Sequence, residues 1–273
     1  AQGWLQHRES FFEALLEGYL QALRHPDLNI PVPSIVKRIR ERPQKTDAEF
    51  LNWATDLMRP TTRSTAVTRA LKPVLTRLHE AAPDLEEDFF EIEAVGGFGL
   101  GIGSALREKY LVRVQGPSPA PDDDVILELK QLEDLSEVRC VDGPERLDPI
   151  RLLAVRSRFT GASDPFLGHL WLDDEAFWIH GWDASYAELD TEGELGSPSE
   201  FSELLYDLGV HLGRGHPEKI ASPRDAELRA DLIHWTERTR GRLHAEVEQL
   251  QGEVHSAWEV FRRRLREVAR TRP

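Results

Sequence analysis

A glycine-rich run, Val95-Gly-Gly-Phe-Gly-Leu-Gly-Ile-Gly-Ser104, holds the residues with the clearest potential for chemistry. Glycine lets backbone N–H groups approach a ligand closely, and loops of this kind bind phosphate. A strand-like segment, Tyr110 to Gln115, follows the run, and a further one, Val125 to Lys130, ends on a single lysine. A glycine-rich loop followed by a strand that carries one cation predicts a phosphate-binding site.

Three nucleotide-binding arrangements use such loops. The dinucleotide fingerprint needs a helix directly after the glycines, whereas a strand follows here, and the loop of the common NTPases needs Gly-Lys-Ser or Gly-Lys-Thr, which is absent. The order strand, glycine loop, strand, connection, strand with terminal lysine is typical of a kinase-like nucleotide lobe. The alternative is a glycine-rich hairpin with an exposed lysine, because Lys130 shares a strand face with Ile126 and Glu128.

Hydrophobic spacing predicts the elements that would position this site. Apolar residues three to four apart indicate helices over most of residues 1–85, and Thr46 with Glu49 forms a capping box. Pro73 predicts a kink or break in a helix over 65–79. From Phe89 the period changes to two, which predicts antiparallel strands. The strands are expected at 90–94, 110–115 and 125–130, and at 169–172 and 176–182 around a turn at Asp173-Asp174.

The rest of the chain is predicted to be helical, over 148–159, over 201–213 and in a long final helix. Its apolar stripe, from Leu243 to Leu265, favours packing against the same chain over a coiled-coil partner. The fold class expected is therefore α+β and kinase-like, a small antiparallel sheet lobe flanked by N-terminal and C-terminal helical regions. The predicted divisions are a helical region over 1–85, a nucleotide lobe over 86–185 and a C-terminal helical region over 186–273.

Composition limits the classes of function. A chain of 273 residues, 40% of them hydrophobic, can form one large domain or two lobes. Its formal charge of −14 argues against a nucleic-acid partner. The one cysteine, Cys140, excludes an intramolecular disulfide, and no apolar run of about 18 residues predicts a membrane span. We expect a cytoplasmic protein, and a first residue, Ala1, that is not methionine favours residues missing upstream.

Metal sites are not predicted. His211 and His216 are five residues apart, whereas two metal ligands on one helical face are separated by three or four residues. A packed or capping pair is therefore favoured. Asp122, Asp123 and Asp124 are interpreted as solvated turn residues. Three tryptophans that could stack on bases, Trp171, Trp178 and Trp182, are interpreted as core or sheet-face aromatics.

Several motifs resemble those of a known family. They are Gly101-Ile-Gly-Ser104, the strand lysine Lys130, Arg151-Leu-Leu153, Ala162-Ser-Asp-Pro-Phe-Leu-Gly168 and Leu212-Gly-Arg-Gly-His216. These motifs are spread along the sequence, which over most of its length resembles the bacterial domain-of-unknown-function family 2252 of the protein-kinase-like superfamily. The segment from Ala162 to Gly168, with its Ala-Ser-Asp-x-Phe-Leu-Gly pattern, is the most specific of these motifs.

The resemblance implies a phosphotransferase-type protein that binds ATP with Mg²⁺. The backbone around Gly101, Gly103 and Ser104 is expected to contact phosphate, Lys130 to neutralise its charge, and Asp183 is a weaker candidate just past a hinge strand. Family members also carry Gly-Asp-x-His-x-x-Asn and Asp-x-Asn-Asp motifs upstream of the region where this chain starts, and neither occurs here.

The chain is therefore expected to be incomplete for catalysis. Its catalytic residues are unknown, and its acceptor, a small molecule or a protein, is not indicated by the sequence. The alternative is a non-catalytic, pseudokinase-like scaffold that binds a protein.

Overall fold

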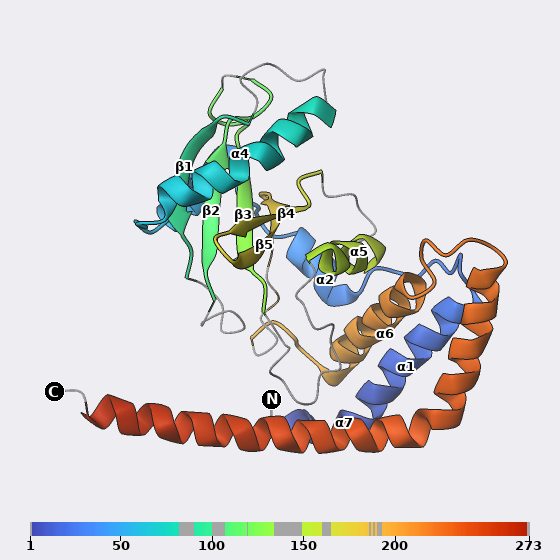
Figure 1. The fold of residues 1–273 in the computed structure, drawn as a ribbon. Coiled ribbons are helices and arrows are strands. Elements are labelled where there is room, and N and C mark those ends of the chain that lie inside the picture. Colours follow the sequence, from blue (N-terminus) through green and yellow to red (C-terminus); the bar gives the residue numbers. More distant parts are fainter. Residues whose placement is uncertain are drawn as a thin grey trace. The chain divides into compact units, whose positions relative to one another are not determined.

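The computed structural model describes residues 2–81, 90–99, 107–118, 120–133, 149–159, 165–185, 187, 189 and 193–271. These residues form seven α-helices, a short 3-10 helix over Gln2–His7 and a five-stranded antiparallel sheet, with helices at both ends of the chain (Figure 1). The predicted α+β class, with a small antiparallel sheet between helical ends, is confirmed. Two compact units are present: Ile39–Leu189 contains the sheet, and Ala1–Arg38 with Asp190–Pro273 is helical.

The sheet lies in the first of these units. Its strands are β1 (Ile92–Gly97), β2 (Lys109–Val114), β3 (Val125–Gln131), β4 (Gly168–Leu172) and β5 (Glu175–Trp182), in the spatial order β1-β2-β3-β5-β4. The predicted turn at Asp173-Asp174 joins β4 to β5. Asp173 has a φ of 56°, in the left-handed region that aspartate tolerates better than most residues.

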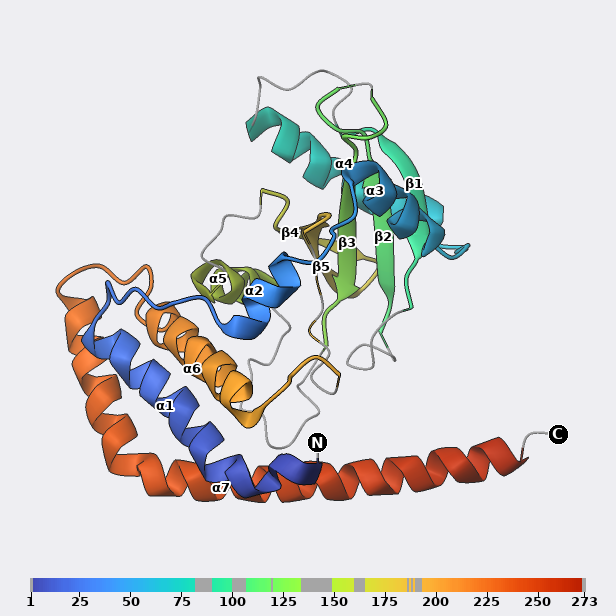
Figure 2. The ribbon, with the colours of Figure 1, turned by 180° about the vertical axis from the view of Figure 1, so that it is seen from behind.

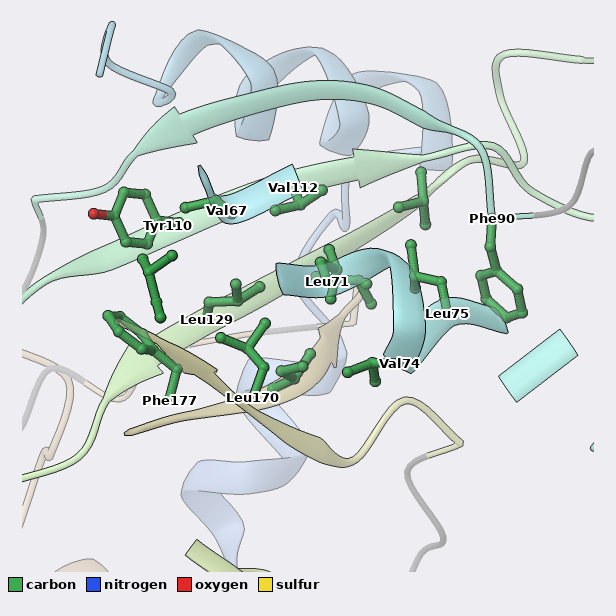
Figure 3. Close-up of a cluster of buried hydrophobic side chains, with 14 residues drawn as sticks. Val67, Leu71, Val74, Leu75, Phe90, Tyr110, Val112, Leu129, Leu170 and Phe177 are labelled. Atoms are coloured by element: carbon green, nitrogen blue, oxygen red, sulfur yellow. The ribbon is translucent and has the colours of Figure 1, made fainter. Parts of the chain in front are cut away.

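One face of the sheet packs against α4 (Ser64–Ala81), which lies across it in Figure 1. Figure 3 shows Val67, Leu71 and Val74 of this helix pointing toward side chains of the strands. Alternation along each strand supplies the opposing residues, which are Tyr110, Val112, Val114, Leu127, Leu129, Leu170, Leu172, Phe177 and Ile179. This cluster is the main hydrophobic core of the unit. The helix is not broken at Pro73, which lies inside it.

The opposite face is covered at one end by α3 (Asp47–Asp56), which Figure 2 shows from behind. The predicted capping box is present, since the Thr46 hydroxyl accepts from the Glu49 N–H and the Glu49 carboxylate accepts from the Thr46 N–H. A second buried cluster joins this helix to the sheet, namely Phe50, Leu51 and Ala54 against Leu111, Ile126 and Trp182. A further helix, α5 (Pro149–Phe159), contacts β4 and β5.

The helical unit is built on α1 (Arg8–Arg24) and α6 (Pro198–Gly215), which pack along each other. Glycines permit their close approach, because a Cβ at Gly209 would lie 2.0 Å from the Leu15 carbonyl oxygen and one at Gly18 would lie 2.0 Å from that of Tyr206. The last helix, α7 (Arg224–Thr271), contacts α1 through Arg24–Glu237 and through Phe12 against His244. The remaining described helix, α2, spans Ser34–Arg40.

None of the helices in the described ranges is long and apolar enough to cross a membrane.

Candidate functional site

A row of polar and aromatic side chains crosses the sheet in register. Lys109 of β2 is paired with Lys130 of β3, Lys130 with Trp178 of β5, and Trp178 with His169 of β4. Along each strand these residues alternate with those of the main core, so they lie on the opposite face of the sheet. The helix α3 covers the other end of this same face. This face is therefore apolar at one end and polar at the other.

We define the polar patch as six described residues of this face and of the helix beside it: Lys109, Glu128, Lys130, Arg156, Trp178 and His180. The sequence prediction named one of them, Lys130, as a site residue. The signal for the others is present in the sequence as two short patterns, Glu128-Leu-Lys130 and Trp178-Ile-His180, which place polar residues two apart on adjacent strands.

Lys130 is held in place and remains accessible. Its Nζ lies 3.0 Å from the Glu128 carboxylate, and 5.3 Å from the centroid of the Trp178 ring. Its side chain is 33% exposed. A lysine placed over an indole gains a cation–π attraction that fixes its stem, and its ammonium retains donors for a ligand because it carries three.

The carboxylate of Glu128 is buried among cationic and aromatic groups. Its Oε2 also lies 3.0 Å from Nε2 of His180, whose ring stacks on Trp178 with centroids 4.5 Å apart. Burial raises the pKa of the Glu128 carboxyl, but the hydrogen bond to His180 and the charge of Lys130 lower it by more. The pKa of Glu128 therefore lies below its ordinary value, and the group is a carboxylate at neutral pH.

Replacing this carboxylate should change how stability depends on pH. The folded-state pKa of Glu128 is depressed, so its stabilising effect is present above the unfolded-state pKa of about 4.3 and is lost as pH falls through the folded-state value. In urea unfolding between about pH 6 and about pH 3, the difference in free energy between the wild type and Glu128→Gln should shrink toward the acid end. A difference that stays constant over this range would contradict the assignment.

A second cation reaches the patch from a helix. The Arg156 guanidinium of α5 lies 4.8 Å from the centroid of the Trp178 ring, so this indole is contacted by both Arg156 and Lys130. The helix is basic over its length, with Arg151, Arg156 and Arg158 and no acidic residue. Guanidinium and ammonium groups at one surface favour an anionic ligand, because arginine forks match phosphate oxygens and lysine adds a point charge.

The glycine-rich segment begins and ends beside this patch. Gly101, Gly103 and Ser104 lie outside the described residues, but the flanks on both sides are described. The Phe98 N–H donates to the Lys109 carbonyl at 2.8 Å, and the Lys109 ammonium lies 5.0 Å from the Phe98 ring centroid. The two described flanks of the glycine-rich segment thus meet at Lys109, the residue that is paired with Lys130.

Asp183 lies at the opposite end of the sheet. It directly follows Trp182, which is paired with Ile126, and it is five residues from Trp178, roughly 16 Å along an extended strand. Its carboxylate accepts a hydrogen bond from the Ser185 N–H at 2.8 Å. The structure therefore does not bring Asp183 together with Lys130, and the two mark different parts of the unit.

A pocket of about 590 Å³ lies beside Asp183, a size typical of small-molecule sites. Its lining residues are Asp47, Phe50, Leu51, Asp122, Asp123, Asp124, Val125, Arg156, Pro165, Phe166, Gly181, Trp182, Asp183 and Ala184. Carboxylates outnumber the single guanidinium in this lining, so the pocket disfavours phosphate, while its aromatic residues and carboxylates suit an apolar body with hydrogen-bond donors. Arg156 belongs to both the pocket and the polar patch.

Within the described residues, no group of three His, Cys, Asp or Glu side chains is placed to hold a metal ion. His216 contacts α1 instead, with its Nδ1 2.8 Å from the Tyr19 hydroxyl, and burial lowers the pKa of its imidazole. His211 lies 3.6 Å from Asp207 of its own helix.

Comparison with known proteins gives one match. Residues 9–264 match the sequence profile of a family described as "Uncharacterized protein conserved in bacteria (DUF2252)". No curated protein and no solved structure matches the chain.

Proposed function

The chain belongs to the bacterial family DUF2252, and from the geometry of the polar patch we propose that it binds the phosphates of a nucleotide there. The ligand is ATP with Mg²⁺, the phosphates contact backbone N–H groups of the glycine-rich segment, and Lys130 neutralises their charge. Arg156 is a second cation for the same phosphates.

One observation carries this proposal. Lys130 is paired with Lys109, and the Lys109 carbonyl accepts a hydrogen bond from the N–H of Phe98, which lies within the glycine-rich run. The described flanks of that segment and the Lys130 ammonium therefore lie at one corner of the sheet. An accessible lysine beside a glycine-rich connection is the combination that binds phosphate in kinase-type sites.

The order of the elements supports a kinase-like lobe. A glycine-rich connection joins β1 to β2, the lysine lies on β3, and α5 lies between β3 and β4. In protein kinases a helix after the lysine strand supplies a glutamate that pairs with the lysine. Here the carboxylate paired with Lys130 is Glu128 of the same strand, and the described helix α5 has cations only.

The two ends of the face suggest how the nucleotide is oriented. The phosphates bind at the polar patch, and the nucleoside extends toward the acidic pocket, where Asp183 accepts hydrogen bonds from its hydroxyl or amino groups. Mg²⁺ is held chiefly by the phosphates, since this ion commonly keeps several waters and uses only one or two protein carboxylates. No described residue is assigned as its ligand.

Binding without phosphoryl transfer is the second candidate function. Transfer requires carboxylates that hold the metal and a group that orients the acceptor, and no described residue is assigned to either task. This second candidate is a pseudokinase-like scaffold that binds a protein. An enzyme would act on a small-molecule or protein acceptor and would need the upstream motifs of the family.

A thermal-shift measurement tests nucleotide binding. Ligand at about 100 times its dissociation constant adds roughly 2.7 kcal/mol to the free energy of unfolding, and each kcal/mol raises the melting temperature by about 2–4 °C. Saturating Mg-ATP should therefore raise the melting temperature by several degrees, and Lys130→Ala should reduce this shift to about half or less at the same ligand concentration. Arg158→Ala, which removes an exposed cation of α5, is the matched control and should keep it. Absence of a shift up to millimolar Mg-ATP would reject the nucleotide proposal and leave the scaffold.

A further inference from the structure

The second half of α7 presents an apolar stripe that its own unit does not cover. The helix is tied to α1 as far as His244, which packs on Phe12. Beyond that point the side chains of the stripe are between 44% and 60% exposed, namely Val247, Leu250, Val254, Trp258, Phe261 and Leu265. Figure 1 shows this part of the helix, in red, extending past α1. A contiguous exposed stripe of large apolar residues marks an interaction surface.

The spacing of the stripe identifies the kind of partner. From Leu243 to Leu265 the apolar residues are separated by 4, 3, 4, 4, 3 and 4 positions. These intervals form two repeats of eleven residues. Each repeat spans three turns, or 3.67 residues per turn, so the stripe runs nearly straight along one face of the helix. The stripe is about 33 Å long at 1.5 Å per residue. Such a regular seam is the pattern of a helix that pairs with another helix.

The same spacing is symmetric about its centre. Leu243 and Leu265, Val247 and Phe261, and Leu250 and Trp258 are equidistant from Val254. An antiparallel second copy would therefore place each apolar residue opposite an apolar residue of its partner, with the two Val254 side chains meeting at the two-fold axis. Self-complementarity of this kind is what an interface with two-fold symmetry requires.

Charge along the helix favours the antiparallel direction. Residues 243–254 contain three glutamates and no lysine or arginine, whereas residues 255–271 contain five arginines and two glutamates. The two halves thus have formal charges of −3 and +3. In an antiparallel pair each acidic half lies along a basic half, while a parallel pair would align like charges, which is unfavourable.

From these observations we infer that the second half of α7 is a homodimerisation helix, which pairs in antiparallel orientation with α7 of a second copy about an axis at Val254. The partner is this chain itself. Glu246 and Arg264, which flank the stripe near its two ends, lie close to each other's symmetry positions and form ion pairs across the dimer. The inference does not depend on nucleotide binding.

Sedimentation equilibrium of the full chain over a range of concentrations measures the association. The wild type should be in a concentration-dependent equilibrium between monomer and dimer. Val254→Glu should raise the dimer dissociation constant by about tenfold or more, because two carboxylates would be buried face to face at the axis. Ser256→Glu adds the same charge on the opposite side of the helix and should leave the dissociation constant unchanged.

Cysteine cross-linking tests the direction in a Cys140→Ser background. In the antiparallel pair, Val247 of one copy faces Phe261 of the other, while the two Val247 positions are about 21 Å apart along the axis. Disulfides should therefore form when Val247→Cys and Phe261→Cys are mixed and not with Val247→Cys alone, since the Cα atoms must come within about 7 Å. A monomer at every concentration, a dimer equally affected by both glutamate variants, or a disulfide formed by Val247→Cys alone would overturn the proposal.

Discussion

Phe177→Ala is expected to lower the free energy of unfolding of the sheet unit by about 3–5 kcal/mol, the usual range for deleting a buried aromatic side chain. Phe177 is fully buried and lies in the core between β5 and α4, with its ring 5.8 Å from that of Tyr110. Figure 3 shows this ring among the side chains of the core. Truncation would leave a cavity, because β5 is packed on both faces and cannot shift to fill the space. Urea unfolding monitored by far-UV circular dichroism measures the loss of stability.

The neighbouring residue provides the control. Trp178 is on the opposite face of β5 and is only partly buried, so Trp178→Ala should destabilise the unit by less than Phe177→Ala. It should instead weaken nucleotide binding, because this ring holds Lys130 and Arg156. Equal losses of stability in the two variants would contradict the assignment of Phe177 to the core and of Trp178 to the binding site.

The second large effect is expected at Gly209, where α6 contacts α1. A Cβ at this position would lie 2.0 Å from the Leu15 carbonyl oxygen and 2.8 Å from the Tyr19 nitrogen, and backbone atoms cannot rotate away. The two helices would have to separate, and overpacking of this kind costs about 1–3 kcal/mol. Gly209→Ala should therefore lower the melting temperature of the helical unit by several degrees, as measured by calorimetry.

Gly241→Ala is the matched substitution in α7. A Cβ there meets nothing within 4 Å, and alanine is the better helix former, so this variant should be as stable as the wild type or up to about 1 kcal/mol more stable. If Gly209→Ala proved as harmless as Gly241→Ala, the close contact between α1 and α6 would be wrong.

Local sequence signals predicted the elements well because their causes are local. The capping box at Thr46 begins α3, the alternation after Phe89 becomes the antiparallel sheet, and the turn at Asp173 joins β4 to β5. The placement of Lys130 on the face of Ile126 and Glu128 also follows directly from the two-residue period. These features depend on residues close together in the chain.

Features that depend on distant segments could not be predicted in this way. Periodicity does not indicate that Gly18 and Gly209, nearly two hundred positions apart, lie where α1 and α6 make contact. Nor does it indicate that Arg156 reaches Trp178, since this requires α5 to dock beside β5. Nor does it indicate that Asp183, expected at the same site as Lys130, lies at the other end of the sheet, because this depends on the register between β3 and β5.

Direct titration of Mg-ATP by isothermal calorimetry into the wild type, Lys130→Ala and Arg158→Ala tests the central claim. A hydrogen bond to a charged group contributes about 1.5–3 kcal/mol, so Lys130→Ala should weaken binding by about tenfold to a hundredfold. The wild type should bind one nucleotide, and Arg158→Ala should bind it with unchanged affinity. Binding that is absent from the wild type, or equally strong in Lys130→Ala, would contradict a phosphate site at this corner of the sheet.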